Sequence, residues 1–127
     1  MQDQWQDIEI NADGARLAGR IYQPSAAPEG VTLIHPAIGA PQKIYRAFAQ
    51  WLAGEHAMIV ITYDYRDFAD SAKFGASLRA SKADKFEWGV LDQSAAVDFA
   101  ADIADALPLT VVGHSIGGLT TPLHPNA

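Results

Sequence analysis

The sequence contains no cysteine among its 127 residues, so disulfide bonds, thiolate metal ligands and cysteine redox chemistry are excluded. Basic residues are also scarce: nine lysines and arginines stand against fifteen aspartates and glutamates, for a formal net charge of −6. A chain of this charge does not favour nucleic acid or an anionic membrane surface as a partner. No apolar run approaches the roughly 20 residues that span a bilayer, so no membrane partner is expected.

The N-terminal segment lacks the features of a secretory signal. Residues Met1 to Asp7 have neither the positive charges nor the apolar run that such a signal requires, so we expect a cytoplasmic protein. With 49% hydrophobic and 19% charged residues, the composition is that of an ordinary soluble globular protein. We therefore treat residues 1–127 as a single domain.

The hydrophobic pattern predicts an N-terminal hairpin followed by alternating strands and helices. Short runs at 8–10 and 15–22 flank an Asn-Ala-Asp-Gly segment, which is a hairpin signal. The further strands expected are 31–34, 57–63 and 109–112, with helices over 41–54 and from Val90 to Pro108, and a long loop over 67–87. This order predicts an α/β fold, in which a hairpin precedes a mostly parallel sheet with flanking helices.

The spacing of large residues predicts which helix faces are buried. In the first helix, Pro41 marks the start, Gly54 marks the stop, and the residues at helical spacing are Ile44, Tyr45, Phe48, Trp51 and Leu52. In the second helix they are Val90, Val97, Ala101 and Ala104. We expect each of these faces to pack on the sheet.

A G-x-S-x-G motif, Gly113-His114-Ser115-Ile116-Gly117, directly follows the apolar run at 109–112. Between a strand and a helix this pattern is typical of a nucleophile elbow, a sharp turn that exposes the serine oxygen above the sheet. Glycine on both sides gives the turn its backbone room. The motif therefore predicts that Ser115 is the nucleophile of a serine hydrolase.

Together, the elbow, the strand-helix series and the hairpin resemble the N-terminal half of an α/β-hydrolase over nearly the whole chain. Four segments are more narrowly similar to a group of bacterial predicted α/β-hydrolases with a serine-aminopeptidase-like domain: 34–42, 45–48, 63–66 and 113–118. That group usually carries glycines where this chain has Asp67 and Ala69. The resemblance implies a single partial α/β-hydrolase domain over 1–127, an incomplete fold that ends just after the elbow.

The resemblance also implies roles for particular residues. Ser115 matches the nucleophile, and the backbone N–H of Ile116 would be one oxyanion-hole donor. The second donor should come from the loop after the strand at 31–34, where Ala37 is the first choice and Ile38 the next. Pro36 has no N–H and cannot serve.

Three more residues are candidates for lining the site, each with a structural alternative. His35 lies beside the oxyanion loop and is expected to order it rather than act as a base. His114 flanks the nucleophile, but adjacent residues on such a turn point apart, which favours a packed histidine. Asp64 follows a strand and could line the pocket, or it could tie down the following loop. No histidine pair has metal-ligand spacing, so no metal and no cofactor are assigned.

The usual partners of the nucleophile are missing after Ser115. In this fold the triad order is serine, then an acid, then histidine, but no Asp or Glu follows Ser115 and the only later histidine is His124. A base nine residues along the nucleophile's own helix would be carried away from the serine. His124 is therefore not expected to be catalytic.

The hypothesis is thus that an intact parent hydrolyses a carboxylic ester or amide of a small-molecule acyl substrate through an acyl-Ser115 intermediate. Alternatives are an inactive truncated or fragment product, a half that completes its site with another chain, and acyltransferase or thioesterase chemistry. The strand at 109–112 would have an open edge, through which we expect self-association.

Overall fold

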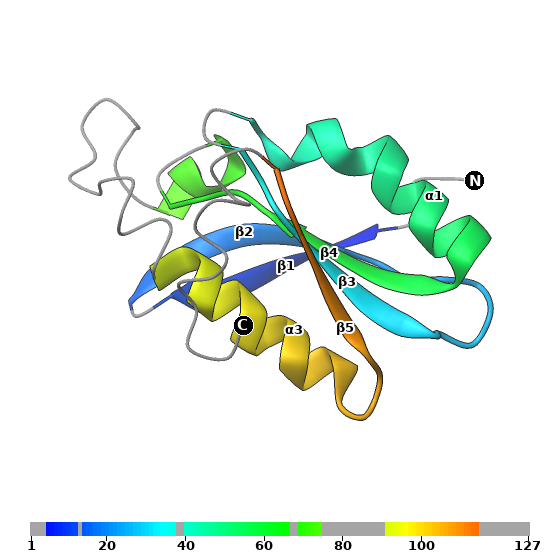
Figure 1. Ribbon diagram of the computed structural model, residues 1–127. Coiled ribbons are helices and arrows are strands. Elements are labelled where there is room, and N and C mark those ends of the chain that lie inside the picture. The colour runs from blue at the N-terminus through cyan, green and yellow to red at the C-terminus, as the bar shows by residue number, and fades with distance from the viewer. Residues whose placement is uncertain (1–4, 13, 38–39, 67–68, 75–90, 115–127) are drawn as a thin grey trace.

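The computed structural model describes residues 5–12, 14–37, 40–66, 69–74 and 91–114, in which five strands form one mixed sheet in the order β1-β2-β4-β3-β5 (Figure 1). The strands are β1 (Trp5–Ala12), β2 (Ala15–Tyr22), β3 (Gly30–His35), β4 (Met58–Tyr63) and β5 (Leu109–Gly113). β1 and β4 each pair antiparallel with β2, whereas β3 is parallel to both β4 and β5. The predicted α/β class, with an N-terminal hairpin and a largely parallel sheet, is confirmed.

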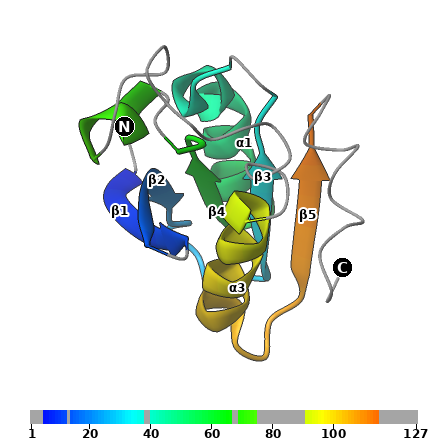
Figure 2. The same ribbon diagram turned by 90° about the vertical axis from the view of Figure 1, so that its left-hand side faces the viewer.

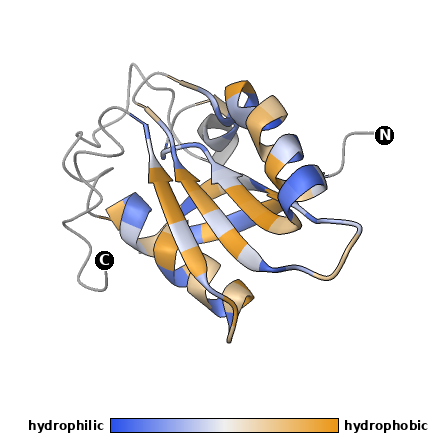
Figure 3. Cartoon of the chain, turned by 45° about the vertical axis from the view of Figure 1, so that its right-hand side comes forward, coloured by the Kyte–Doolittle hydropathy of each residue, from blue (hydrophilic) through white to orange (hydrophobic). Residues whose placement is uncertain are grey.

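The helical elements are η1 (Gln42–Tyr45), α1 (Arg46–His56), η2 (Ala69–Phe74) and α3 (Gln93–Ala104). α1 and α3 lie on opposite faces of the sheet (Figures 1 and 2). Residues of β3 alternate between the two faces: Leu33 packs in the cluster that α3 covers, and Ile34 in the cluster that α1 covers. Burial on both faces explains why β3 and β4 are apolar over most of their length (Figure 3).

The predicted inward face of the first helix is only partly correct, because Tyr45 and Leu52 pack against the cluster between α1 and the sheet, whereas the other three residues do not. Ile44, Phe48 and Trp51 are 55%, 40% and 51% exposed, and the residues of α1 buried against the sheet are Ala49 and Ala53. Because Ala49 and Ala53 are small and four residues apart, the helix backbone lies close to the strands. The larger side chains on the other sides of the helix are therefore exposed to solvent. The 3₁₀ turn of η1 before α1 also breaks the 3.6-residue phase that the prediction assumed.

The predicted stop at Gly54 is also wrong, because α1 continues to His56. The residue that ends the helix is Ala57, which adopts the left-handed conformation with φ of 54°. Its N–H bonds back to the Leu52 carbonyl, so the left-handed cap is made without glycine. β4 consequently begins at Met58 rather than at Ala57.

α3 is shorter than predicted and buries a partly different face. Val97 and Ala104 are buried as expected, but Ala101 is exposed, and Ala96 and Ala100 pack on the sheet instead. Val90 lies outside the described residues. The predicted loop over 67–87 contains η2, which the lack of apolar periodicity did not reveal.

Candidate active site at the carboxyl ends of the parallel strands

The three parallel strands end at one edge of the sheet, where open α/β sheets bind their ligands. β3 ends at His35 and leads into Ala37, β4 is followed by Asp64, and β5 is followed by His114. The His114 N–H donates to the His35 carbonyl at 3.1 Å, which extends the β3–β5 pairing past the end of β5. The structure thus brings His35, Ala37, Asp64 and His114 to the same end of the sheet.

Two tyrosines hold the loop that follows β3. The Tyr65 hydroxyl donates to the Pro36 carbonyl at 2.6 Å, and the Tyr45 hydroxyl accepts from the Ala37 N–H at 3.0 Å. The Ala40 N–H closes a turn onto the Ala37 carbonyl at 3.1 Å. The loop expected to carry an oxyanion donor is therefore fixed by side chains from two other segments.

Tyr45 also reaches the end of β5. Its Oη lies 2.8 Å from His114 Nδ1, and the two rings meet edge to face with centroids 5.8 Å apart. Burial raises the pKa of Tyr45, although the hydrogen bond from Ala37 opposes this, so the hydroxyl keeps its proton at neutral pH. Sequence reasoning missed this residue, because its helical spacing assigned it to the apolar face of the first helix.

His35 is fully buried at the end of β3. Its Nδ1 lies 2.6 Å from the Tyr63 hydroxyl, and the rings are edge to face. Burial raises the pKa of Tyr63 well above its ordinary value, so this hydroxyl remains protonated. His35 therefore links β3 to β4 inside the sheet, directly before the loop that contains Ala37.

Asp64 is buried at the end of β4 and accepts hydrogen bonds from two segments. The Gln42 N–H donates to Oδ1 at 2.7 Å, and the Gln42 side-chain amide and the Asp70 N–H donate to Oδ2 at 3.1 and 3.2 Å. Burial raises the pKa of Asp64 to about 6, despite these hydrogen bonds. The Asp64 carboxylate therefore joins the end of β4 to η1 and η2. This agrees with the prediction that Asp64 ties down the loop that follows its strand.

A buried ion pair joins the segment after β4 to the start of α3. The Arg66 guanidinium contacts Asp92 Oδ1 at 2.6 and 2.8 Å, and the Arg66 N–H donates to Oδ2 at 2.8 Å. Next to it, the Gln93 side chain donates to the Tyr65 hydroxyl at 3.0 Å. These contacts fix Tyr65, and through it the loop after β3.

Other predicted residues fall outside the described part of the chain. These are Ser115, Ile116, Ile38 and His124. Within the described ranges no group of three or more His, Cys, Asp or Glu residues could hold a metal ion. The helices of those ranges include none that is long and apolar enough to cross a membrane.

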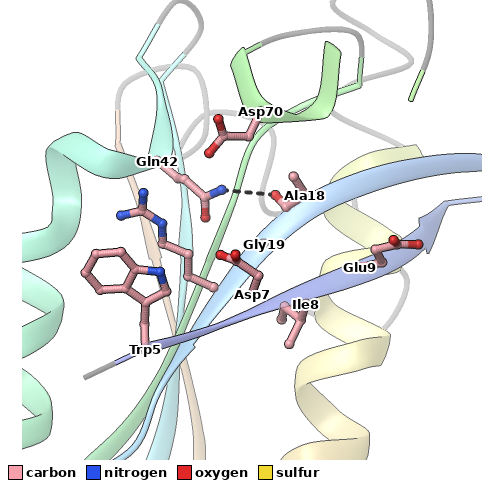
Figure 4. Close-up of a pocket in the computed structure, with 9 residues that line it drawn as sticks. Trp5, Asp7, Ile8, Glu9, Ala18, Gly19, Gln42 and Asp70 are labelled. Carbon is pink, nitrogen blue, oxygen red and sulfur yellow. Dashed lines mark hydrogen bonds between the residues drawn. The ribbon is translucent and has the colours of Figure 1, made fainter. Parts of the chain in front are cut away.

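A separate cavity of about 380 Å³ lies over the β1–β2 hairpin (Figure 4). Arg20 stacks its guanidinium over the Trp5 ring at 4.2 Å, and the Gln42 amide donates to the Ala18 carbonyl at 3.3 Å. Three carboxylates, of Asp7, Glu9 and Asp70, share its lining. A wall of this polarity does not suit an acyl chain, and among the described residues none of the predicted site residues lines it.

Comparison with solved structures reveals extensive likeness, although the sequence matches no protein-family model and no curated protein. The chain is similar to an esterase from Pyrococcus furiosus at 18% identity and a TM-score of 0.73, covering 94% of this chain and 43% of that one. It is similar to a thermostable carboxyl esterase from Bacillus coagulans at 17% identity and a TM-score of 0.70, covering 94% and 39%. An alpha-beta serine hydrolase homologue from Coxiella burnetii matches at 19% identity and a TM-score of 0.68, covering 91% and 54%.

These likenesses show that the chain has the α/β-hydrolase fold, as the sequence resemblance predicts. The chain spans about 39 to 54% of the length of these three solved structures.

Proposed function

We propose that this chain carries the nucleophile of a serine hydrolase, with Ser115 attacking a carboxylic ester or amide of a small acyl substrate. The observation that carries the proposal is that Ser115 is the second residue after β5, whose carboxyl end adjoins that of β3. In an α/β-hydrolase sheet the nucleophile is presented at this position. The esterases among the similar structures support the same class of chemistry.

The proposed reaction begins with addition of Ser115 Oγ to the acyl carbon, which places negative charge on the carbonyl oxygen. The Ile116 N–H and a group at the loop after β3, at Ala37 or next to it at Ile38, would stabilise that oxyanion. His35 and Asp64 hold this loop and its neighbours, and His114 precedes the nucleophile. Collapse of the intermediate yields an acyl-serine, which water then hydrolyses without a cofactor.

The acid and the base that should accompany Ser115 are not assigned among residues 1–127. No Asp or Glu follows Ser115, and His124 is the only later histidine. The proposal leaves the source of the acid and the base open, with completion of the site by another chain as one alternative. Acyltransferases and thioesterases use the same first step, so the acceptor of the acyl group stays open.

The test is covalent labelling of the purified chain with a fluorophosphonate probe, followed by peptide mapping. We expect slow labelling at Ser115 and none in Ser115→Ala. Ser71 is an internal comparison, because its buried hydroxyl already donates to the Asp64 carbonyl and accepts from the Ala18 N–H. Equal labelling of the chain and of Ser115→Ala would refute the assignment.

A further inference from the structure

The Ala37 N–H, which sequence reasoning expects to stabilise the oxyanion, already has an acceptor. It donates to Tyr45 Oη at 3.0 Å, and that same oxygen lies 2.8 Å from His114 Nδ1. The hydroxyl therefore stands between the loop after β3 and the end of β5. Ser115 is the next residue in the chain.

The Ala37 N–H, the Tyr45 hydroxyl and His114 Nδ1 differ in whether they can donate or accept a hydrogen bond, and this limits how they pair. A backbone N–H can only donate, so Tyr45 Oη accepts from Ala37. The Tyr45 oxygen has a second lone pair, so whether Tyr45 Oη donates to His114 Nδ1 or accepts from it depends on which ring nitrogen carries the proton. A hydroxyl proton can turn about the C–O bond, whereas an amide proton is fixed, so the proton of Tyr45 can be redirected to another acceptor nearby.

We infer that the Tyr45 hydroxyl, rather than the Ala37 N–H, is the second donor to the oxyanion that forms at Ser115. This inference rests on the proposed function. The Ala37 N–H already donates a hydrogen bond to Tyr45 Oη, and this bond polarises the Tyr45 hydroxyl. When negative charge develops, the hydroxyl proton turns to the oxyanion, because a hydrogen bond to an ionised oxygen is stronger than one to a neutral acceptor.

The Tyr45 ring is held independently of its hydroxyl. It packs against the buried cluster of Tyr22, Ile34, Ala49, Ala53 and Val60 between α1 and the sheet. Tyr45→Phe therefore removes one oxygen and keeps the packing. Tyr22→Phe is a matched control, since Tyr22 is fully buried in the same cluster and its hydroxyl bonds to Arg20 Nη1 at 3.5 Å.

The experiment measures the rate of fluorophosphonate labelling at Ser115. In this reaction the bond from Ser115 Oγ to phosphorus forms as the P–F bond breaks, fluoride leaves, and the serine proton passes to water. The phosphoryl oxygen gains negative charge, so it requires the same donors as an acyl oxyanion. We expect Tyr45→Phe to slow labelling on the order of 10- to 100-fold, with Tyr22→Phe close to the unaltered chain.

Two further measurements distinguish a failure of this inference from a failure of the proposed function. The amide resonance of Ala37 in a ¹⁵N–¹H spectrum should move in Tyr45→Phe; an unchanged resonance would overturn this inference alone. 3-Fluorotyrosine at position 45, which keeps the hydroxyl and makes it more acidic, should label at least as fast as the unaltered chain. Labelling of Tyr45→Phe at an equal or higher rate would show that Ala37 itself serves the oxyanion. Equal labelling of Ser115→Ala would overturn the proposed function and this inference with it.

Discussion

Gln42 donates to the carboxylate of Asp64 through both its backbone N–H, at 2.7 Å, and its side-chain amide, at 3.1 Å. The side-chain oxygen of Gln42, Oε1, in turn accepts from the Thr62 hydroxyl at 2.9 Å, so the orientation of the side-chain amide is set. Gln42 begins η1, and Tyr45 ends it. Asp64 thus supports Tyr45 at a distance, by fixing the start of the turn that carries it.

The stability of the chain should depend on the ionisation of Asp64. Its pKa rises on folding from 3.8 to about 6, so the folded state binds the proton more tightly than the unfolded state. Ionisation of Asp64 therefore lowers the free energy of unfolding. The loss is absent below about pH 4, grows as the pH rises, and is complete above about pH 6, where it reaches up to about 3 kcal/mol.

Urea unfolding of the chain and of Asp64→Asn at about pH 4.5 and pH 7.5 checks this dependence. Asparagine does not titrate, and the other carboxylates contribute equally to both proteins. We expect the free energy of unfolding of the unaltered chain, relative to Asp64→Asn, to fall as the pH rises. A relative stability that is constant or rises with pH would contradict the raised pKa.

The strands were predicted well from the local sequence, because whether a segment forms a buried strand depends mainly on the residues within that segment. The run at 31–34 is apolar because both faces of β3 are buried, and Gly14, with φ of 94°, allows the tight turn between β1 and β2. Helix faces and ends were predicted less well. Ala49 and Ala53 determine how closely α1 approaches the sheet, but small residues give a weak periodic signal.

Replacing Ala57 by glycine should stabilise the chain. Ala57 has φ of 54°, in the left-handed region where a Cβ is strained. Relief of that strain outweighs the added freedom of the unfolded chain, so we expect a gain of about 0.5 to 1 kcal/mol. Thermal unfolding would measure it, with Ala47→Gly, an exposed position inside α1, as a control that should lose stability.

The same change at Ala69 tests a second alanine in the left-handed conformation. Ala69 also has positive φ, 48°. We expect Ala69→Gly to stabilise by a similar amount, about 0.5 to 1 kcal/mol. Unfolding at a lower temperature than the unaltered chain would show that the alanine side chain contributes contacts worth more than the strain.

Loss of Arg66 should be costly, because it removes the guanidinium that contacts the buried carboxylate of Asp92. The Asp92 side chain is 0% exposed and that of Arg66 is 13% exposed. We expect Arg66→Met to destabilise by about 3 to 5 kcal/mol. Combining it with Asp92→Asn should cost less than the sum of the two single changes, as measured by chemical unfolding. Additive costs would mean that the pair is not coupled.

The candidate site was harder to predict than the fold, because its contacts join residues far apart in sequence. Tyr45 and His114 are 69 positions apart, and Arg66 and Asp92 are 26 apart. Only the elbow motif and the end of the strand at 31–34 are local signals. The segments that carry the resemblance include Tyr45 and Tyr65, but the resemblance gives these residues no role. Their hydroxyl partners lie on other strands and loops and are known only from the structure.

We propose that β5 mediates self-association. β5 lies at one edge of the sheet, and its only strand partner among the described residues is β3 (Figure 2). Val111 and Val112 are only half-buried, and an apolar strand at the edge of a sheet templates pairing with a second copy. Sedimentation velocity should show oligomers, and Thr110→Lys, which puts a charge on the exposed edge, should reduce them. A monomer at all concentrations would refute the proposal.

The 127-residue chain should show little or no turnover of a p-nitrophenyl ester. Removing triad members from a serine hydrolase costs on the order of 10⁴ to 10⁶ in rate. No acid follows Ser115, and the only later histidine is His124, nine residues further on. Steady-state rates of the chain, Ser115→Ala and His124→Ala should therefore be equal and near background. Robust turnover that is lost in both variants would make His124 a working base, whereas loss in Ser115→Ala alone would place the base among the residues before Ser115.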